Sequence, residues 1–253
     1  MQEIGMSAEL EEFADLVRKS RSIAIFTGAG ISTESGIPDF RSPGGLWEKN
    51  RPIDFSEFLQ SEEARHESWR RKFAMESVLS KAEPNKGHMA ISSLYGEGRV
   101  CAVITQNIDG LHQASGVSDA DVIEVHGNTT YAKCLDCATR MELERVKEIF
   151  AVDETLPSCE KCGGLIKTAT ISFGQAMPVD EMRRAAEAAL SCDLFVAIGS
   201  SLVVYPAAEI PLTAKQAGAP LVILNREPTP LDGYADLVLH REIGETLASV
   251  TKL

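Results

Sequence analysis

No apolar run in the 253-residue sequence approaches the roughly 20 residues that a bilayer-spanning helix requires. The first residues, MQEIGMSAELEEF, are acidic and lack the basic start and apolar core of a secretory signal. From these two absences we expect a cytoplasmic protein that makes no use of a membrane.

Positive charge is also scarce. The sequence has 25 lysines and arginines against 37 aspartates and glutamates, which gives a net charge of -12. Broad binding to a phosphate backbone needs a face rich in Lys and Arg, so no direct nucleic-acid binding is expected. An acidic chain suits a basic partner such as a lysine-rich peptide, but solubility alone is the favoured explanation of the charge.

Short runs rich in Val and Ile alternate with helical patterns along the chain. The expected strands cover residues 23–27, 100–105, 122–125, 194–198, 221–224 and 236–239, and the expected helices cover 8–19, 86–95, 179–190 and 206–216. Little polar alternation within the strands indicates a sheet covered on both faces. The alternation of strand and helix predicts an α/β fold with a parallel sheet.

Two segments, 42–84 and 128–170, do not follow this alternation. The first is polar, charged and mostly helical in pattern, and the second contains paired cysteines. Both are interpreted as insertions that together build a smaller domain. Ligands of open α/β sheets bind beyond the carboxyl ends of the strands, so a small domain placed there would create a cleft.

The paired cysteines give the strongest signal of a metal site. They form two Cys-x-x-Cys pairs, Cys134 with Cys137 and Cys159 with Cys162. Two such knuckles close a tetrahedral shell of four thiolates, which suits one zinc ion. The 21 residues between the pairs slightly exceed the usual spacing. Since thiolates would fill every coordination position, the zinc is predicted to be structural; redox dithiols or free thiols are the alternatives.

The two remaining cysteines, Cys101 and Cys192, stand alone in or beside apolar stretches. We expect them to behave as small buried hydrophobic residues.

A glycine-rich turn follows the first expected strand. Gly28, Ala29 and Gly30 would let backbone N–H groups approach a pyrophosphate. The match to the G-x-G-x-x-G fingerprint is imperfect, because Thr33 occupies the third glycine position and the acidic residue after a second strand is missing. Taken alone, the motif is explained equally well by a tight turn between a strand and a helix.

Other strand ends carry groups suited to a nucleotide. Gly199, Ser200 and Ser201 follow one strand, and Asn225 follows the next. Small hydroxyls and an amide at strand ends are well placed to bind ribose hydroxyls. Together with the glycine-rich turn, they predict a dinucleotide site.

Two further strand ends offer groups for catalysis. Gln106, Asn107 and Asp109 follow the strand 100–105, where they could recognise a carboxamide and ribose hydroxyls or simply cap the loop. His126 follows the strand 122–125, and its ordinary pKa near neutrality makes it a candidate general base. A purely structural histidine is the alternative.

These motifs, in this order, resemble those of the sirtuins. The resemblance rests on GAGISTESGIPDFRS at 28–42, TQNID at 105–109, His126-Gly127, the paired cysteines, Phe173-Gly174 and GSSL at 199–202, and it runs from about residue 23 to the C-terminus. It implies a Rossmann-like NAD-binding domain made of residues 1–41, 85–127 and 171–253. It also implies a small domain made of the helical insertion, 42–84, and the zinc module, 128–170.

The resemblance also assigns roles to residues. It makes His126, Asn107 and Asp109 catalytic, and it places the acyl-lysine peptide as an added strand against Ile171, Phe173 and Gly174 on one side and Val203 on the other. The residues implied to contact NAD are Gly28, Ala29, Gly30, Thr33, Phe40, Arg41, Gln106, Asn107, Ile108, Asp109, His126, Gly199, Ser200, Ser201, Asn225 and Ile243.

The activity implied by the resemblance is NAD-dependent protein-lysine deacylation. The acyl oxygen of the modified lysine would attack C1′ of the nicotinamide ribose and displace nicotinamide, and His126 would accept a proton from the ribose hydroxyls. NAD would be consumed as a co-substrate, giving free lysine and 2′-O-acyl-ADP-ribose. The alternatives are a protein mono-ADP-ribosyltransferase that uses the same cleft and a non-enzymatic scaffold that binds zinc or NAD.

The sequence departs from the family pattern in places. Gln175 stands where many members have Glu, and Thr168 stands where many have proline, which leaves the peptide preference open. Members that remove acidic acyl groups carry a Tyr–Arg pair in the helical insertion, whereas this chain has WRRKFAM at 69–75. The absence of the pair, and the apolar end of this stretch from Phe73 to Met75, predict a preference for neutral acyl groups, unless Arg70 or Arg71 turns inward.

Overall fold

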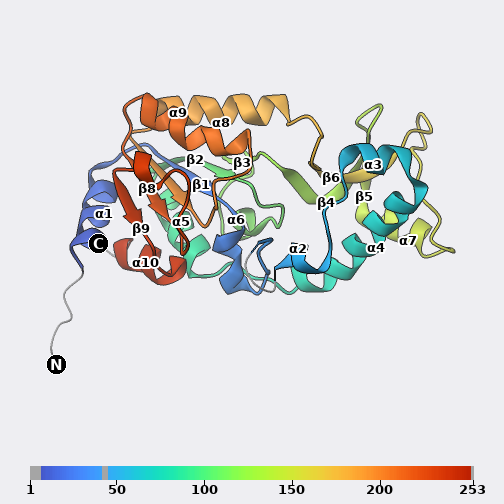
Figure 1. The fold of residues 1–253 in the computed structure, drawn as a ribbon, viewed down its shortest axis with the longest axis horizontal. Coiled ribbons are helices and arrows are strands. Elements are labelled where there is room, and N and C mark those ends of the chain that lie inside the picture. The colour runs from blue at the N-terminus through green and yellow to red at the C-terminus, as the bar shows by residue number, and fades with distance from the viewer. Residues whose placement is uncertain (1–6, 42–44, 252–253) are drawn as a thin grey trace.

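A six-stranded parallel sheet forms the centre of the larger lobe in the computed structural model, which describes residues 7–41 and 45–251 (Figure 1). The strands are β1 (Ile23–Thr27), β2 (Val100–Thr105), β3 (Val122–Glu124), β7 (Leu194–Ile198), β8 (Leu221–Leu224) and β9 (Leu237–Leu239). Their order is β3-β2-β1-β7-β8-β9, and every neighbouring pair is parallel. This is the strand order of the Rossmann fold.

Helices cover both faces of this sheet (Figure 1). One core joins the strands to α1 (Ala8–Lys19), α5 (Lys86–Gly96) and α10 (Ile243–Val250). The second core joins the opposite face to α8 (Val179–Ser191) and α9 (Ile210–Gln216), which a short turn, η2 (Ala207–Glu209), precedes. The expected α/β fold is confirmed, and the expected strands and helices lie close to their predicted bounds because burial on two faces selects continuous Val and Ile runs.

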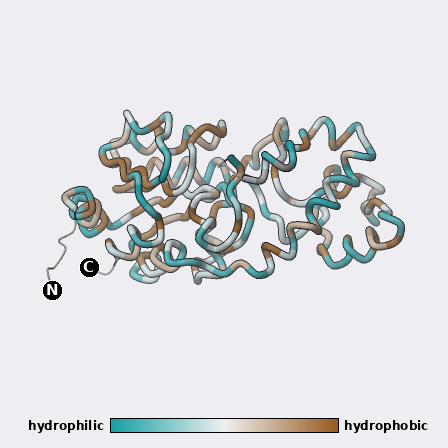
Figure 2. Tube along the Cα trace, turned by 60° about the horizontal axis from the view of Figure 1, so that its bottom comes forward, coloured by the Kyte–Doolittle hydropathy of each residue, from teal (hydrophilic) through white to brown (hydrophobic). Residues whose placement is uncertain are grey.

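Within the described residues, no helix is both long and apolar enough to cross a membrane. Hydrophobic and hydrophilic stretches are interspersed along the coloured trace (Figure 2). Amphipathic helices such as α1 and α8 bury their apolar side chains in the two cores.

A smaller lobe contains the paired cysteines and most of the helical insertion (Figure 1). Its sheet has the order β5-β4-β6 and is antiparallel, with β4 (Gly127–Cys134), β5 (Arg140–Glu142) and β6 (Ile166–Thr170). Its helices are α2 (Leu46–Lys49), α3 (Phe55–Gln60), α4 (Glu62–Leu79) and α7 (Leu143–Phe150).

A third core holds this lobe together. Trp69 of α4 packs with Val146 of α7 and Ile166 of β6, so the helical insertion and the cysteine-bearing segment share their buried surface. The domain boundaries given above stay predictions. Ser42, where the first family motif ends and the insertion begins, lies outside the described residues.

One expectation about the lone cysteines is wrong. Cys101 is exposed, because the pairing of β1 with β2 shifts register between Ile23 and Ala24 and the extra residue leaves the regular alternation. Phe73 stacks on Trp69 and packs against Phe150 beside the third core, and the apolar acyl pocket stays a prediction. Cys192 is half-buried against the second core, close to what we expected.

Candidate active site and metal centre

The candidate cofactor site lies where the strand order reverses, between β1 and β7. After β1 the chain enters the short helix η1 (Ala29–Ser35), and the backbone N–H of Gly30 donates to the carbonyl of Gly199 at 2.8 Å. A Cβ on Gly28 would lie 2.8 Å from that same carbonyl oxygen. Glycine is therefore required for the loops after β1 and β7 to pack together, and this packing forms the crevice in which doubly wound folds bind nucleotides.

Direct hydrogen bonds bring the predicted strand ends together. Gln106 Nε2 donates to Ser200 Oγ at 2.7 Å, which joins the ends of β2 and β7. Asn107 Nδ2 donates to the carbonyl of Gly28 at 3.2 Å, which joins the ends of β2 and β1. Asn225, after β8, instead donates its amide to the carbonyl of Glu227 in its own loop.

One buried residue of this network, Ser32, was missed as a candidate. Its hydroxyl donates to Asp109 Oδ2 at 2.7 Å and accepts from Asn107 Nδ2 at 3.0 Å. A serine in a glycine-rich loop is ordinarily explained by the turn itself. Only its position within the motif at 28–42 could have singled it out.

His126 is poised to accept a proton at one defined nitrogen. Its Nδ1 lies 3.1 Å from the carbonyl oxygen of Gln106, which can only accept, so Nδ1 carries the proton and Nε2 keeps a free lone pair. Burial lowers the pKa of His126 below its ordinary value, and the bond to the Gln106 carbonyl opposes this effect in part. The imidazole is therefore neutral at neutral pH.

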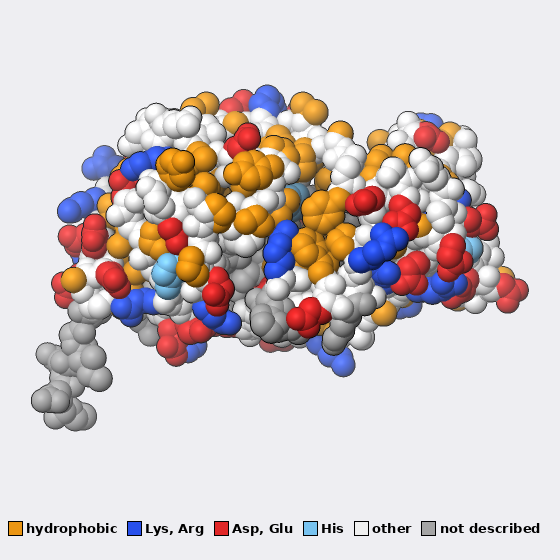
Figure 3. Space-filling model, in the orientation of Figure 1, with side chains coloured by type: hydrophobic (Ala, Val, Ile, Leu, Met, Phe, Trp, Pro, Cys, Tyr) orange, Lys and Arg blue, Asp and Glu red, His pale blue; other side chains and the backbone are white. Residues whose placement is uncertain are grey.

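The candidate peptide segment, which begins at Ile171, is hydrogen-bonded to the backbone of His126. The backbone N–H of Ile171 donates to the carbonyl of His126 at 2.8 Å. Beyond it, Phe173 is 44% exposed, and Val203 and Tyr205 on the other side are 43% and 59% exposed. Figure 3 shows hydrophobic side chains gathered in the hollowed middle of one face. Large exposed apolar side chains of this kind mark a surface on which another chain docks.

An aromatic cluster connects this segment to the loop after η1. The Trp47 ring lies 5.4 Å from the Phe40 ring and 5.5 Å from the Phe173 ring, between centroids. The Arg41 guanidinium stands 4.2 Å over Trp47, a favourable cation–π arrangement. Phe40 and Arg41 thus lie beside the candidate peptide segment.

The other candidates lie around the same crevice. Thr33 donates its hydroxyl to the carbonyl of Gly30, inside η1. Glu34 accepts from the backbone N–H of Gly244 at 2.8 Å, which holds η1 against the start of α10, where Ile243 is buried. Three predicted cofactor contacts lie on the loops after β1, β2 and β7: Ala29, Ile108 and Ser201. Each is half-buried, so part of its surface is accessible to a cofactor.

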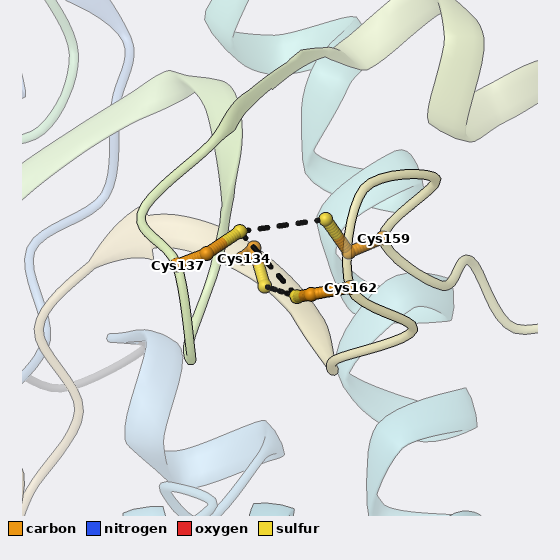
Figure 4. A group of neighbouring side chains, drawn as sticks. All are labelled: Cys134, Cys137, Cys159 and Cys162. Atoms are coloured by element: carbon orange, nitrogen blue, oxygen red, sulfur yellow. Dashed lines mark hydrogen bonds between the residues drawn. The ribbon is translucent and has the colours of Figure 1, made fainter.

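The four paired cysteines converge on one point in the small lobe (Figure 4). Their Sγ atoms all lie within 4.8 Å of one another, and three of the pairs are separated by 3.4 to 3.6 Å. Tetrahedral thiolates bound at about 2.3 Å to zinc stand roughly 3.8 Å apart, so the arrangement fits a zinc ion. Four thiolates leave no position for a catalytic water, and the site is structural.

The second knuckle needs its glycines. Gly163 has φ +74°, and its backbone N–H donates to the carbonyl of Cys159 at 2.7 Å. A Cβ on Gly164 would lie 2.9 Å from Cys134 Sγ. Backbone freedom and the absence of a side chain thus let the two knuckles close around the metal.

The two arginines considered for acidic acyl groups are already paired. Arg70 binds Glu154 at 2.5 Å and Glu63 at 2.8 Å. Arg71 binds Glu67 at 2.6 Å and donates to the carbonyl of Arg51 at 2.7 Å. Neither guanidinium is free to receive a substrate carboxylate without giving up these partners.

Comparison with known proteins agrees with this geometry. The family model described as "Sir2 family" matches residues 28–206. An NAD-dependent protein deacetylase of Rhodopseudomonas palustris is 59% identical over 243 residues, covering 96% of each chain. A solved structure of Sir2 with a p53 peptide and NAD+ has a TM-score of 0.84 at 38% identity and covers 96% of this chain and 97% of its own. A structure of Sir2Tm with a propionylated peptide has a TM-score of 0.83 at 37% identity, covering 96% and 98%.

A match of this extent and identity, on a chain whose strand-end network and four-cysteine cluster follow the family motifs, leaves one conclusion. The chain belongs to the Sir2 family, the sirtuins.

Proposed function

We propose that the protein is an NAD-dependent protein-lysine deacylase that releases nicotinamide, free lysine and 2′-O-acyl-ADP-ribose. The observation that carries the proposal is the neutral His126, whose unprotonated Nε2 is fixed by the Nδ1 bond to Gln106, next to the segment that begins at Ile171. The relatives named as NAD-dependent deacetylases and the Sir2 structure with peptide and NAD+ support it.

Each part of the site has a defined task in this reaction. The loops after β1 and β7 hold NAD, which supplies the electrophilic ribose carbon when bound. The exposed side chains of Phe173 and Val203 flank the acyl-lysine peptide, which adds as a strand. Asp109 and Asn107 orient the nicotinamide end, and His126 takes the proton of a ribose hydroxyl at Nε2.

The test is a single incubation analysed by mass spectrometry. Acetyl-lysine peptide, NAD and the purified protein should yield equimolar deacetylated peptide, nicotinamide and acetyl-ADP-ribose, and none of these should form without NAD. Retention of the acetyl group after prolonged incubation with NAD would contradict the proposal.

The same experiment with NAD labelled in the adenosine half separates the main alternative. A mono-ADP-ribosyltransferase would leave the label on protein or peptide, whereas a deacylase leaves it in a small acyl ester. A non-enzymatic scaffold would bind NAD and produce neither.

The pH dependence follows from the pKa of His126. Burial lowers that pKa below the ordinary 6.5, so the base is already unprotonated at neutral pH. The value of kcat/KM should therefore change little just above pH 6.5 and fall only as acid protonates His126, with a midpoint below 6.5. A pH–rate profile measures it, since kcat/KM reports groups of the free enzyme. A midpoint above 7 would be inconsistent with the buried, neutral imidazole.

Acyl selectivity follows from the paired arginines. A succinyl carboxylate would find Arg70 and Arg71 held by Glu63, Glu67 and Glu154, and an unpaired buried carboxylate costs several kcal/mol. We therefore expect kcat/KM for acetyl-lysine to exceed that for succinyl-lysine by about 10-fold or more on the same peptide, as a loss of at least about 1.4 kcal/mol implies.

The matched variants for this prediction are Arg70→Ala and Arg71→Ala. Both should leave the ratio of acetyl to succinyl turnover nearly unchanged. A succinyl preference in the wild type that disappears in either variant would show that the arginine serves the acyl pocket. Propionyl-lysine is a neutral probe of intermediate size, and a solved structure of Sir2Tm contains a propionylated peptide.

We further propose a cytoplasmic location and a lysine-bearing protein as partner, without direct nucleic-acid binding. A cluster of four thiols without a disulfide suits a reducing compartment. The net charge of -12 favours basic segments over phosphate backbones.

A further inference from the structure

A buried chain of polar side chains lies beneath the ends of β1 and β2, and the reaction steps given above do not use it. Thr27 and Thr105 are the last residues of the two strands, stand opposite each other in the register and are 0% and 3% exposed. Thr27 Oγ1 donates to Thr105 Oγ1 at 2.8 Å, and Thr105 Oγ1 accepts the backbone N–H of Asn107 at 3.0 Å. His112 of α6 (Leu111–Ala114) places its Nε2 2.9 Å from Thr27 Oγ1.

At the histidine end of this series of hydrogen bonds, two ring nitrogens have no hydrogen-bond partner among the described residues. His112 and His88 are 1% and 0% exposed, and their ring centroids are 5.0 Å apart. Among the described residues, neither His112 Nδ1 nor His88 Nε2 has a hydrogen-bond partner. Buried polar atoms without a partner are rare, so the arrangement calls for a physical explanation.

The hydrogen bonds fix the tautomer of His88. The backbone N–H of Asn85 points at His88 Nδ1 at 3.4 Å, so Nδ1 is the acceptor and Nε2 carries the proton. The unpaired nitrogen of His88 is therefore a donor, in a ring whose centroid lies 5.0 Å from that of His112.

The tautomer of His112 follows from the bond between the two threonines. Thr27 Oγ1 gives its only proton to Thr105 Oγ1, so it can only accept from His112, and His112 Nε2 carries the proton. His112 Nδ1 is then an acceptor without a partner among the described residues.

Burial also keeps both rings neutral. Desolvation lowers the pKa of His88 to about 4 and that of His112 to about 3. One proton per ring at neutral pH gives the hydrogen bonds a single direction, from His112 Nε2 to Thr27 and from Thr27 to Thr105.

The other end of the chain reaches the catalytic groups. Asn107, whose backbone N–H is held by Thr105, places its side-chain amide on Gly28 and Ser32, and Ser32 in turn binds Asp109. Because the links from His112 through Thr27 and Thr105 to Asn107 are buried, water cannot replace a hydroxyl that is lost. The position of Asn107 therefore depends on groups that never touch the substrates.

We propose that His112, acting through Thr27 and Thr105, is a positioning residue for Asn107 in the deacylation reaction. The proposal rests on the proposed function. In this proposal the two threonine hydroxyls hold Asn107 in position, whereas in a purely structural core they would only fill space.

The kinetic test compares a substitution that removes the hydroxyl with one that keeps it. Thr27→Val keeps the branched shape and removes the hydroxyl, and Thr27→Ser keeps the hydroxyl. Misplacement of a reacting group by about 1 Å can cost roughly 10²-fold in rate, so we expect kcat of Thr27→Val to fall by about 10-fold or more. The KM values for peptide and NAD should stay within about threefold, and Thr27→Ser should keep most of the activity.

A kcat of Thr27→Val within about threefold of the wild type would overturn the proposal, as would an equal loss in Thr27→Ser. Thr105→Val, which cuts the bond to Asn107 directly, should reproduce the loss and serves as the second variant if Thr27→Val does not fold. Zinc content and Tm of each variant check that the fold is intact.

The tautomers are measured on the wild-type protein by long-range ¹H–¹⁵N spectra of the histidine rings, assigned with single His→Gln variants. His88 and His112 should both carry the proton at Nε2, whereas His126 should carry it at Nδ1. A proton at Nδ1 of His112 would overturn the proposed series of hydrogen bonds from His112 to Thr105. Since this readout needs no turnover, it separates failure of the chain from failure of the proposed deacylase activity.

Discussion

His126→Ala is expected to lose deacylation by about 10²-fold or more while its fold and much of its NAD binding remain, because a positioned general base contributes about 10²–10⁴-fold. The ring is half-buried just before β4 and hydrogen-bonds through Nδ1 to the carbonyl of Gln106, so its removal should disturb little else of the fold. The measurement is kcat and kcat/KM on an acetyl-lysine peptide, with NAD affinity by calorimetry.

The matched control is His240→Ala. His240 is exposed and binds the carbonyl of Asn225 through Nδ1, in the way His126 binds that of Gln106, but it lies after β9. It should keep nearly full turnover. Near-normal activity in His126→Ala would remove the histidine from the mechanism, while an equal loss in both variants would point to a general effect of losing an imidazole.

Loss of the metal should have the largest effect on stability. Cys134→Ala removes one of four ligands that hold β4 against the second knuckle, and ligand binding is part of the folding free energy of such modules. We expect the variant to retain far less than one zinc per chain. A destabilisation of a few kcal/mol would lower Tm by roughly 10 °C, at about 2–4 °C per kcal/mol in a chain of this size. Metal analysis and thermal unfolding measure both.

Cys101→Ala is the control for this experiment, because Cys101 is an exposed thiol outside the cluster. It should keep one zinc and an unchanged Tm. A wild-type protein that contains no zinc after purification under reducing, chelator-free conditions would contradict the structural assignment. So would a Cys134→Ala variant that unfolds at the wild-type temperature.

Much of the fold could be predicted from local sequence. Continuous Val and Ile runs such as 194–198 and 221–224 specify strands buried on both faces, because only a sheet covered by helices hides such runs from water. The Cys-x-x-Cys pairs specified a metal knuckle for a similar reason: the spacing alone brings two thiolates to one side of a tight turn. The glycines at 28 and 30 marked the turn after β1.

Contacts between residues far apart in the sequence decided the rest. Whether Cys101 is buried depends on a register shift between β1 and β2, and whether Arg70 is free depends on Glu154, 84 residues away. Ser32 becomes part of the site only because the end of β2 brings Asn107 and Asp109 to it. His88 and His112 lie in α5 and α6, but their tautomers are fixed by Asn85 and Thr27, partners that periodicity does not reveal. These hydrogen bonds and packing contacts join strand ends that are close only in the folded structure. A local pattern of residue types therefore does not show which distant residue a given side chain will contact.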